Sequence, residues 1–511
     1  MKNMIRGFLV LLVLISGGCA TLKPAPHTQD VYSMPPAPSG VLSTVASAVA
    51  KDHSPGQCGF LLLSSSAEAY KWRLALVDQA TQSIDAQYFI WQDDEVGVLL
   101  FERLLRAADR GVRVRLLVDD MVFAPDDRSV AALTLHPNID IKIFNPGKVR
   151  ESLVGSAIDF LSNLEELNRR MHNKLFIADN HVAIVGGRNI GNEYFGLGKK
   201  YNFRDLDVLV VGPVLSELAS AFDAYWNAEL AYPGRAMSDK ASIEEIGPIR
   251  KRDEAYLAKR ADVLSSYPLK PRDWEETFRQ LPKALVPGRA YFLQDKPVLI
   301  GEEEHRLLDM LNYIAAPSQE EIVIVSPYFI PTEGLLNKLE ELLSRGVKVS
   351  IITPSMGANN HTAAHSHYKK YRRKILEIGA SLYEMKHDLP AEIRRLSNVP
   401  PVASEFTCLH VKAMVADRDR CFVGSLNLDP RAIELNTENG LYIESPGLCG
   451  QIADQFDALM SPENAWRVYL DEDNQMKWES SSGTVTRQPA RHFWQRVSDF
   501  FFRLLPIESQ I

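Results

Sequence analysis

A histidine, a lysine and an aspartate are spaced in an H-x-K-x4-D pattern within residues 171–189, MHNKLFIADNHVAIVGGRN. They are His172, Lys174 and Asp179, and the segment closes on a glycine pair followed by Asn189. Residues 172 and 174 share a face if the chain is extended here, so an imidazole and an ammonium would lie side by side. That pair suits a phosphate group, since it combines a nucleophile or proton donor with a positive charge.

The same spacing occurs a second time in residues 409–427, LHVKAMVADRDRCFVGSLN. One short motif is a weak hypothesis. Two copies in register, each closing on an asparagine at the same offset, predict one duplicated phosphate site. The residues of the second copy are His410, Lys412, Asp417 and Asn427.

These blocks resemble the double HKD motif of the phospholipase D superfamily. The segment 84–120, IDAQYFIWQDDEVGVLLFERLLRAADRGVRVRLLVDD, and the ending RLLPIE are similar to bacterial cardiolipin synthases, most closely those of the C type. The resemblance spans roughly residues 58–511. It implies an enzyme without a cofactor or metal, which moves a phosphatidyl group through a phosphohistidine.

The resemblance also implies roles for the paired residues. His172 would be the nucleophile and His410 the acid and base, although the symmetry of the motifs leaves the reverse order open. Lys174, Lys412 and the two asparagines, Asn189 and Asn427, would hold the phosphate oxygens. The motif aspartates, Asp179 and Asp417, are expected to brace the site rather than to touch substrate.

A pair of carboxylates follows the two motifs at matching positions. Residues 204–213, RDLDVLVVGP, align with 437–446, TENGLYIESP, which pairs Asp205 with Glu438. Carboxylates commonly orient catalytic histidines through hydrogen bonds, so we expect this role for both.

The segment 359–386 resembles the part of cardiolipin synthases that carries histidine, tyrosine and arginine along one helix. His365, Tyr368 and Arg372 would share a face of that helix. They are candidates to line the headgroup side of the cleft, and a basic solvated helix is the alternative.

Two α/β domains are predicted from an internal repeat. In each half an apolar strand leads to a helix that ends at a glycine, Gly111 or Gly346, and a second apolar strand follows. This order is typical of βαβ units, so we expect two pseudo-twofold-related domains, each a mixed sheet flanked by helices, sharing one cleft. The expected domains are residues 58–231 and 291–470.

The remaining segments are expected to connect or anchor these domains. Residues 232–290 indicate a charged, partly helical linker, and residues 148–170 a helix that either packs on the protein or covers the site. In the tail, 471–511, a helix presents aromatic residues on one side, which suits either a bilayer interface or the protein's own core.

The N-terminus is typical of an export signal. Basic residues precede a short apolar run, and small residues then lead to Cys19. This cysteine resembles the lipid-modified cysteine of bacterial lipoproteins, with an uncleaved anchor as the alternative. The proline-rich residues 20–57 predict an extended tether. We therefore expect a lipid-anchored protein in a bacterial envelope, facing the periplasm.

Composition and charge restrict the function further. A net charge of −8 argues against broad nucleic-acid binding. Cys58, Cys408, Cys421 and Cys449 are too few and scattered for a disulfide framework or a metal site, and Cys408 is expected to pack. The expected partners are phospholipids and a membrane surface, with an accessory protein possible. The leading function is cardiolipin synthesis from phosphatidylglycerol and a second phospholipid, with a hydrolytic phospholipase D or another phosphodiesterase as alternatives.

Overall fold

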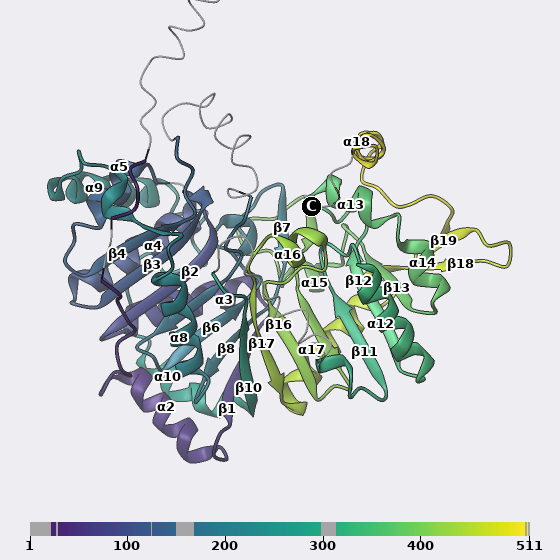
Figure 1. Ribbon diagram of the computed structural model, residues 1–511, viewed down its shortest axis with the longest axis horizontal. Helices are drawn as coiled ribbons and strands as arrows, with labels where there is room; N and C mark the ends of the chain where they lie inside the picture. Colours follow the sequence, from purple (N-terminus) through teal and green to yellow (C-terminus); the bar gives the residue numbers. More distant parts are fainter. Residues whose placement is uncertain are drawn as a thin grey trace, which may run out of the picture.

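The computed structural model describes residues 22–26, 29–123, 125–149, 168–297, 313–505 and 508. Two α/β halves lie side by side and share one continuous sheet (Figure 1). The strands of the first half are β1 (Cys58–Leu63), β2 (Ser83–Trp91), β3 (Arg113–Phe123), β4 (Ile139–Phe144), β5 (Leu175–Ala178), β6 (Val182–Gly186), β7 (Tyr201–Arg204), β8 (Asp207–Val211) and β9 (Ala231–Pro233). Those that follow are β10 (Val286–Gln294), β11 (Glu321–Val325), β12 (Lys348–Pro354), β13 (Ser381–Met385), β14 (Phe406–Leu409), β15 (Ala413–Ala416), β16 (Arg420–Gly424), β17 (Asn439–Glu444), β18 (Ala465–Leu470), β19 (Met476–Ser480) and β20 (Gly483–Val485).

Helices cover both faces of the sheet. The α-helices are α2 (Val41–Asp52), α3 (Ser66–Gln79), α4 (Glu95–Asp109), α5 (Asp127–Leu133), α8 (Leu215–Trp226), α9 (Ile246–Lys259), α10 (Glu275–Ala284), α12 (Glu333–Ser344), α13 (Thr362–Tyr368), α14 (Arg372–Glu377), α15 (Ala391–Arg394), α16 (Pro430–Glu434), α17 (Pro446–Met460) and α18 (Phe493–Arg503). Three short 3-10 helices are η1 (Asn192–Tyr194), η2 (Gly234–Met237) and η3 (Ile243–Glu245).

The predicted βαβ units are confirmed in both halves. Strand β2 pairs parallel with β3 through the crossover helix α4, and β11 pairs parallel with β12 through α12. Each crossover helix begins at a side-chain cap, Asp94 or Thr332. Each is followed by the expected glycine with positive φ, 96° at Gly111 and 85° at Gly346.

The expected pseudo-twofold arrangement is confirmed by the strand order, β9-β4-β3-β2-β5-β6-β8-β1-β10-β17-β16-β15-β11-β12-β13-β18-β19-β20. Read outward from the antiparallel β1–β10 pair, the two halves repeat the same sequence of parallel and antiparallel neighbours. The two copies of the repeat therefore form one sheet, and the β1–β10 pair lies at its centre.

Two of the expected connecting segments are packed parts of the fold. Within the predicted tether, residues 41–52 form α2, whose Leu42, Val45 and Val49 are buried in the core of the first half, so an extended conformation is wrong there. The predicted linker is partly helical, as expected. However, Trp274, Phe278 and Leu281 are buried in the same core, so residues 274–284 belong to the first half.

The second half extends beyond the expected boundary at residue 470. Strands β19 and β20 continue the sheet from β18, so the packed structure reaches residue 485. A disulfide joins Cys421 of β16 to Cys449 of α17. The spacing of the cysteines gave no sign of this single pair, because it is the packing of α17 on the sheet that brings the two residues together.

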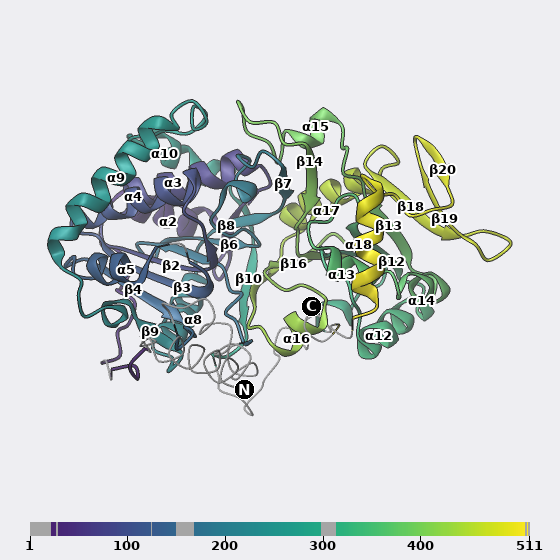
Figure 2. The same cartoon turned by 90° about the horizontal axis from the view of Figure 1, so that it is seen from above.

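The tail helix α18 lies over α13 at the upper edge of the second half (Figures 1 and 2). Among the residues that the structure describes, no helix is both long enough and apolar enough to cross a bilayer.

Candidate active site

Two short parallel contacts bring the halves together at the motifs. Strand β7 pairs with β14 so that Arg204 lies opposite Leu409, and the next residues, Asp205 and His410, are therefore neighbours. An isolated parallel β-bridge pairs Met171 with Thr437, so the next residues, His172 and Glu438, are also neighbours. The backbone repeats this symmetry, since the N–H groups of His410 and His172 donate to the carbonyl oxygens of Arg204 and Thr437, each at 2.9 Å.

Each histidine is paired with the carboxylate of the opposite half. Nδ1 of His172 lies 2.8 Å from Oε2 of Glu438, and Nδ1 of His410 lies 2.6 Å from Oδ2 of Asp205. With the proton on Nδ1, each imidazole donates to its carboxylate and leaves Nε2 as the basic nitrogen. All four residues are at most 7% exposed. The two sets therefore form one site.

The motif lysines lie against the histidines in the connections immediately before β5 and β15. Lys174 Nζ donates to the carbonyl oxygen of His172 at 2.5 Å. Lys412 Nζ lies 2.9 Å from the carbonyl oxygen of His410 and 3.1 Å from its Nε2. Both lysines are buried, so their charge acts in a medium of low dielectric constant.

Burial keeps both imidazoles neutral. It lowers the pKa of His172 well below its usual range, and the charges of Lys174 and Lys412 act in the same direction. It lowers the pKa of His410 to about 4, with Lys412 adding to the shift and Asp205 opposing it. A neutral imidazole is the nucleophilic form, so the free site holds two imidazoles able to attack phosphorus.

The two carboxylates differ in their ionisation. Burial raises the pKa of Glu438 well above its usual range, against the opposing charge of Lys174. Burial also acts to raise the pKa of Asp205, but His410 and Lys412 hold it below its ordinary value. Asp205 is thus the more readily ionised of the two, and an ionised carboxylate stabilises an imidazolium. His410 is thus better placed to hold a proton than His172.

Aromatic rings enclose the imidazoles, a feature that the motifs do not predict. The ring of Phe89 lies 4.8 Å from that of His172. Tyr194 and Phe203 lie 5.2 and 4.6 Å from His410. Phe89 belongs to the repeated strand IDAQYFI, so its position beside the motif could have been expected once the sheet order was known. The rings contribute to the exclusion of water that shifts the histidine pKa values.

The motif aspartates lie at the far ends of the hairpins and hold backbone. Asp179 accepts hydrogen bonds from the backbone N–H groups of Thr81, Gln82 and Ser83, just before and at the start of β2. Asp417 does the same for residues 319–321 at the start of β11. Both sit in hairpin turns with positive φ. Each one therefore fixes its hairpin to the antiparallel neighbour of that hairpin, β2 or β11.

Residues that close the two motifs contact the carboxylates. A Cβ atom at Gly187 would come within 2.6 Å of Asp205, so glycine is needed there. The equivalent residue in the second half is Ser425, whose hydroxyl donates to Glu438. Asn189 donates to the Tyr194 hydroxyl at 3.0 Å, whereas the buried Oδ1 of Asn427 has no partner among the described residues. An unpartnered buried amide is a candidate ligand contact.

His365, Tyr368 and Arg372 are buried together, but on two short helices, α13 and α14, rather than on the single helix expected. Arg372 contacts His365 at 3.0 Å, and Glu384 accepts hydrogen bonds from Tyr368 and Arg372. His365 also pairs with Asp499 of α18 at 2.8 Å. A basic solvated helix is therefore wrong, because the three residues belong to a buried network that also holds α18. Their role at the lipid headgroup stays a prediction.

The other sequence predictions fall outside the site. Cys408 is buried, and burial raises the pKa of its thiol to about 12, as suits packing rather than chemistry. Cys19 and most of the expected helix in residues 148–170, namely 150–167, lie outside the described residues.

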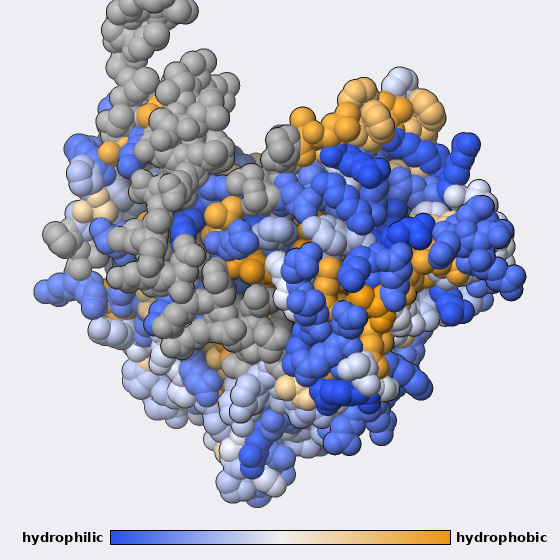
Figure 3. Space-filling model, turned by 45° about the vertical axis from the view of Figure 1, so that its right-hand side comes forward, coloured by the Kyte–Doolittle hydropathy of each residue, from blue (hydrophilic) through white to orange (hydrophobic). Residues whose placement is uncertain are grey.

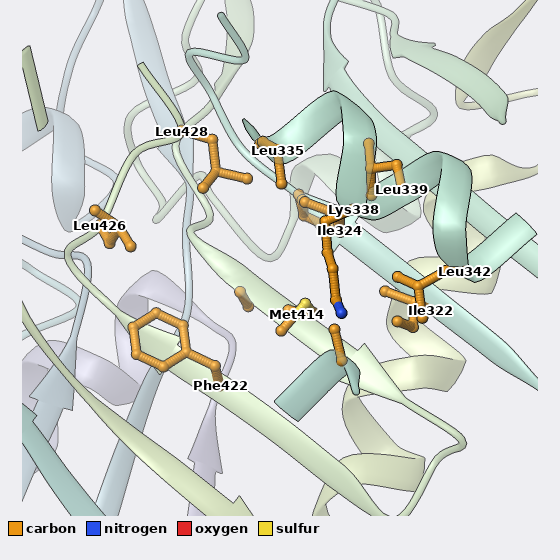
Figure 4. Close-up of a pocket in the computed structure, with 13 residues that line it drawn as sticks. Ile322, Ile324, Leu335, Lys338, Leu339, Leu342, Met414, Phe422, Leu426 and Leu428 are labelled. Atoms are coloured by element: carbon orange, nitrogen blue, oxygen red, sulfur yellow. The ribbon is translucent and has the colours of Figure 1, made fainter. Parts of the chain in front are cut away.

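An apolar pocket between α12 and the sheet contains one charged side chain, Lys338, and does not include the catalytic set (Figure 4).

Comparisons with known proteins agree with this geometry. A family model described as "Cardiolipin synthase, PLD-like domain" matches residues 74–226 and 310–460. The chain is 35% identical over 466 residues to cardiolipin synthase C of Escherichia coli, covering 89% of this chain and 96% of the relative. It is 26% identical to a cardiolipin synthase of Clostridium perfringens, covering 74% of this chain and 66% of the relative.

A solved structure shares the fold. The phosphatidylserine synthase of Haemophilus influenzae superposes with a TM-score of 0.53 at 18% identity, covering 83% of this chain and 91% of that one. The duplicated motif, the crossed histidine–carboxylate pairs and these matches lead to one conclusion. The chain is an enzyme that belongs to the phospholipase D-like family of cardiolipin synthases.

Proposed function

We propose that this enzyme transfers a phosphatidyl group from one phospholipid to a hydroxyl of another and so makes cardiolipin. Phosphatidylglycerol supplies the hydroxyl, and phosphatidylethanolamine is the second phospholipid. The crossed pairing of His172 with Glu438 and of His410 with Asp205 carries the proposal, because it supports two imidazoles acting on one phosphorus.

In the first step, Nε2 of His172 attacks phosphorus and the bond from phosphorus to the headgroup oxygen breaks. His410 gives its proton to that oxygen, and the phosphatidyl group remains on His172. In the second step, His410 takes the proton of the incoming hydroxyl, whose oxygen attacks phosphorus. The nitrogen–phosphorus bond breaks, and His172 returns as a neutral imidazole.

The different carboxylates support this order of roles. His410 must carry a proton before the first step and again after the second, and the ionised Asp205 stabilises that charge. Binding of an anionic phosphodiester offsets the lysine charges and raises the pKa of His410 toward the range needed for proton transfer. Lys174, Lys412 and the two asparagines, Asn189 and Asn427, would hold the phosphate oxygens as charge develops.

We further propose that the enzyme works in a bacterial envelope on the periplasmic side, tethered by an acyl group on Cys19. The disulfide between Cys421 and Cys449 supports this compartment, because structural disulfides persist where the environment is oxidising.

Lipid profiling tests the reaction. The chain is expressed in a bacterium without cardiolipin synthases, with phosphatidylethanolamine labelled in its phosphatidyl portion, and a His410→Ala chain serves as control. Labelled cardiolipin is expected only with the active chain. Accumulation of labelled phosphatidic acid without cardiolipin would establish a hydrolytic phospholipase D instead. Unlabelled cardiolipin would exclude phosphatidylethanolamine as the donor.

A further inference from the structure

The tail helix α18 turns its aromatic side outward. Trp494 is 70% exposed and Phe501 62%, which is unusual for side chains of this size in a folded domain. Figure 3 shows their side of the helix as an apolar ridge along the upper edge of the molecule. We call this ridge the aromatic face, and it consists of Phe493, Trp494, Phe500, Phe501, Leu504 and Leu505.

The opposite, polar side of α18 is the side that packs on the protein. Asp499 is 1% exposed and pairs with His365 and Lys369 of the segment beneath it. Gln495 is also buried and donates to the carbonyl oxygen of Met356. A surface helix ordinarily buries its apolar side and exposes its polar side, so the orientation here is reversed.

This orientation is fixed by the buried polar groups. Asp499 and Gln495 could not leave their partners without losing hydrogen bonds in a site closed to water. Arg372 strengthens this network, since it donates to Gln488 at 2.7 Å and contacts His365. The aromatic face is therefore presented outward by a specific network, rather than left exposed by a loosely attached tail.

We propose that the aromatic face inserts into the interface of a phospholipid bilayer. Tryptophan and phenylalanine on a helix that also carries arginines are typical of helices lying at the level of the lipid headgroups. Arg503 is exposed beside this face and suits anionic lipid phosphates. The aromatic face is a narrow, protruding ridge, and the fluid interface of a bilayer can surround such a shape. A stable protein dimer would instead bury a broad patch of about 800 Å² on each partner.

The location of α18 places a bilayer beside the catalytic groups. Helix α13, on which α18 is seated, is capped by His361, whose ring lies 5.7 Å from that of Tyr328. Tyr328 in turn is close enough to Tyr194 to affect its pKa, and Tyr194 packs on His410. The helix on which α18 packs is thus linked to His410 through Tyr328 and Tyr194, so a bilayer held by α18 lies near the histidines.

Quenching of tryptophan fluorescence by brominated lipid tests the proposal. The full chain is mixed with vesicles of phosphatidylglycerol and phosphatidylethanolamine whose acyl chains are either brominated or plain. Bromine quenches only tryptophans that touch the acyl region. Trp494→Phe should remove most of the bromine-dependent quenching, while Trp72→Phe, a half-buried position on α3 of the first half, should leave it unchanged.

The outcomes distinguish a bilayer from a second copy of this chain as the partner of the aromatic face. Bromine-dependent quenching that persists in Trp494→Phe would overturn the proposal, as would loss of Trp494 exposure through a concentration-dependent dimer without lipid. The melting curve of Trp494→Phe should match the wild type, since this side chain is 70% exposed. A His410→Ala chain should be quenched like the wild type, so a failure of the proposed reaction would leave this test intact.

A second measurement removes the contribution of the proposed acyl anchor. In a Cys19→Ser chain, Trp494→Glu together with Phe501→Glu should lower flotation with anionic vesicles several-fold relative to Cys19→Ser alone. Unchanged flotation would contradict insertion of the aromatic face. The matched control is Val485→Glu, which adds a charge at an exposed apolar position of β20 and should have no effect.

Discussion

Nδ1 of His172 lies 2.8 Å from a carboxylate oxygen of Glu438, which belongs to the other half of the chain. The reciprocal contact joins His410 to Asp205 at 2.6 Å. Neither half can therefore complete its own catalytic set. The duplicated sequence became a single enzyme because each copy supplies the carboxylate that orients the histidine of the other.

Replacement of either histidine should abolish transfer. We expect His172→Ala and His410→Ala each to lower turnover by at least about 100-fold, since acid–base catalysis alone contributes on that order. Turnover is measured on mixed phospholipid micelles, with Cys408→Ala as a control for a buried change beside the site. Phosphoprotein should be trapped on His172 in the His410→Ala chain. Trapping on His410 in the His172→Ala chain alone would reverse the roles.

The two carboxylates should differ in their contributions. Asp205→Asn removes a charge that stabilises the His410 imidazolium, so kcat should fall by about 100-fold or more. Glu438→Gln replaces a carboxyl whose pKa is raised well above its usual range and keeps an oxygen for His172, so a loss of about tenfold is expected. Equal losses would show that the two carboxylates share one ionisation state.

Activity should decline in mildly alkaline solution. Burial lowers the pKa of Lys412 to about 8, so its ammonium loses its proton as the pH rises through that value. The kcat/KM profile should show an alkaline limb near pH 8. In Lys412→Arg, whose guanidinium stays charged, the limb should move upward even if the rate is lower. An unchanged limb in this variant would assign it to another group.

Transfer should survive chelation of divalent metal. The positive charge facing the phosphodiester comes from Lys174 and Lys412, which lie against the two imidazoles. Activity is measured after dialysis against EDTA, with a magnesium-dependent phosphodiesterase as the control for complete removal. Full loss that one divalent ion restores would refute this prediction.

The disulfide should stabilise the second half. It closes a loop of 28 residues between β16 and α17, so its loss should cost about 3 kcal/mol. Melting is followed with and without reductant. A Cys421→Ala, Cys449→Ala double variant, which has no disulfide to lose, should be insensitive to reductant. Equal sensitivity of both proteins would show that reduction acts elsewhere.

Several features were determined by the sequence alone because they depend on neighbours along the chain. The spacing of His172 and Lys174 and the glycine ends of the crossover helices are local properties. They predicted two βαβ domains and the two catalytic sets. The alignment of the halves also singled out Asp205 and Glu438, but it could not say which histidine each would meet.

Tertiary structure decided the features that depend on distant partners. Each histidine meets the carboxylate of the opposite half because the β7–β14 pairing and the Met171–Thr437 bridge both join opposite halves. The amphipathic pattern of α18 was visible, but the side that packs was decided by Asp499 meeting His365. A period of 3.6 residues shows that a helix has two sides, and only the groups facing it determine which side is buried.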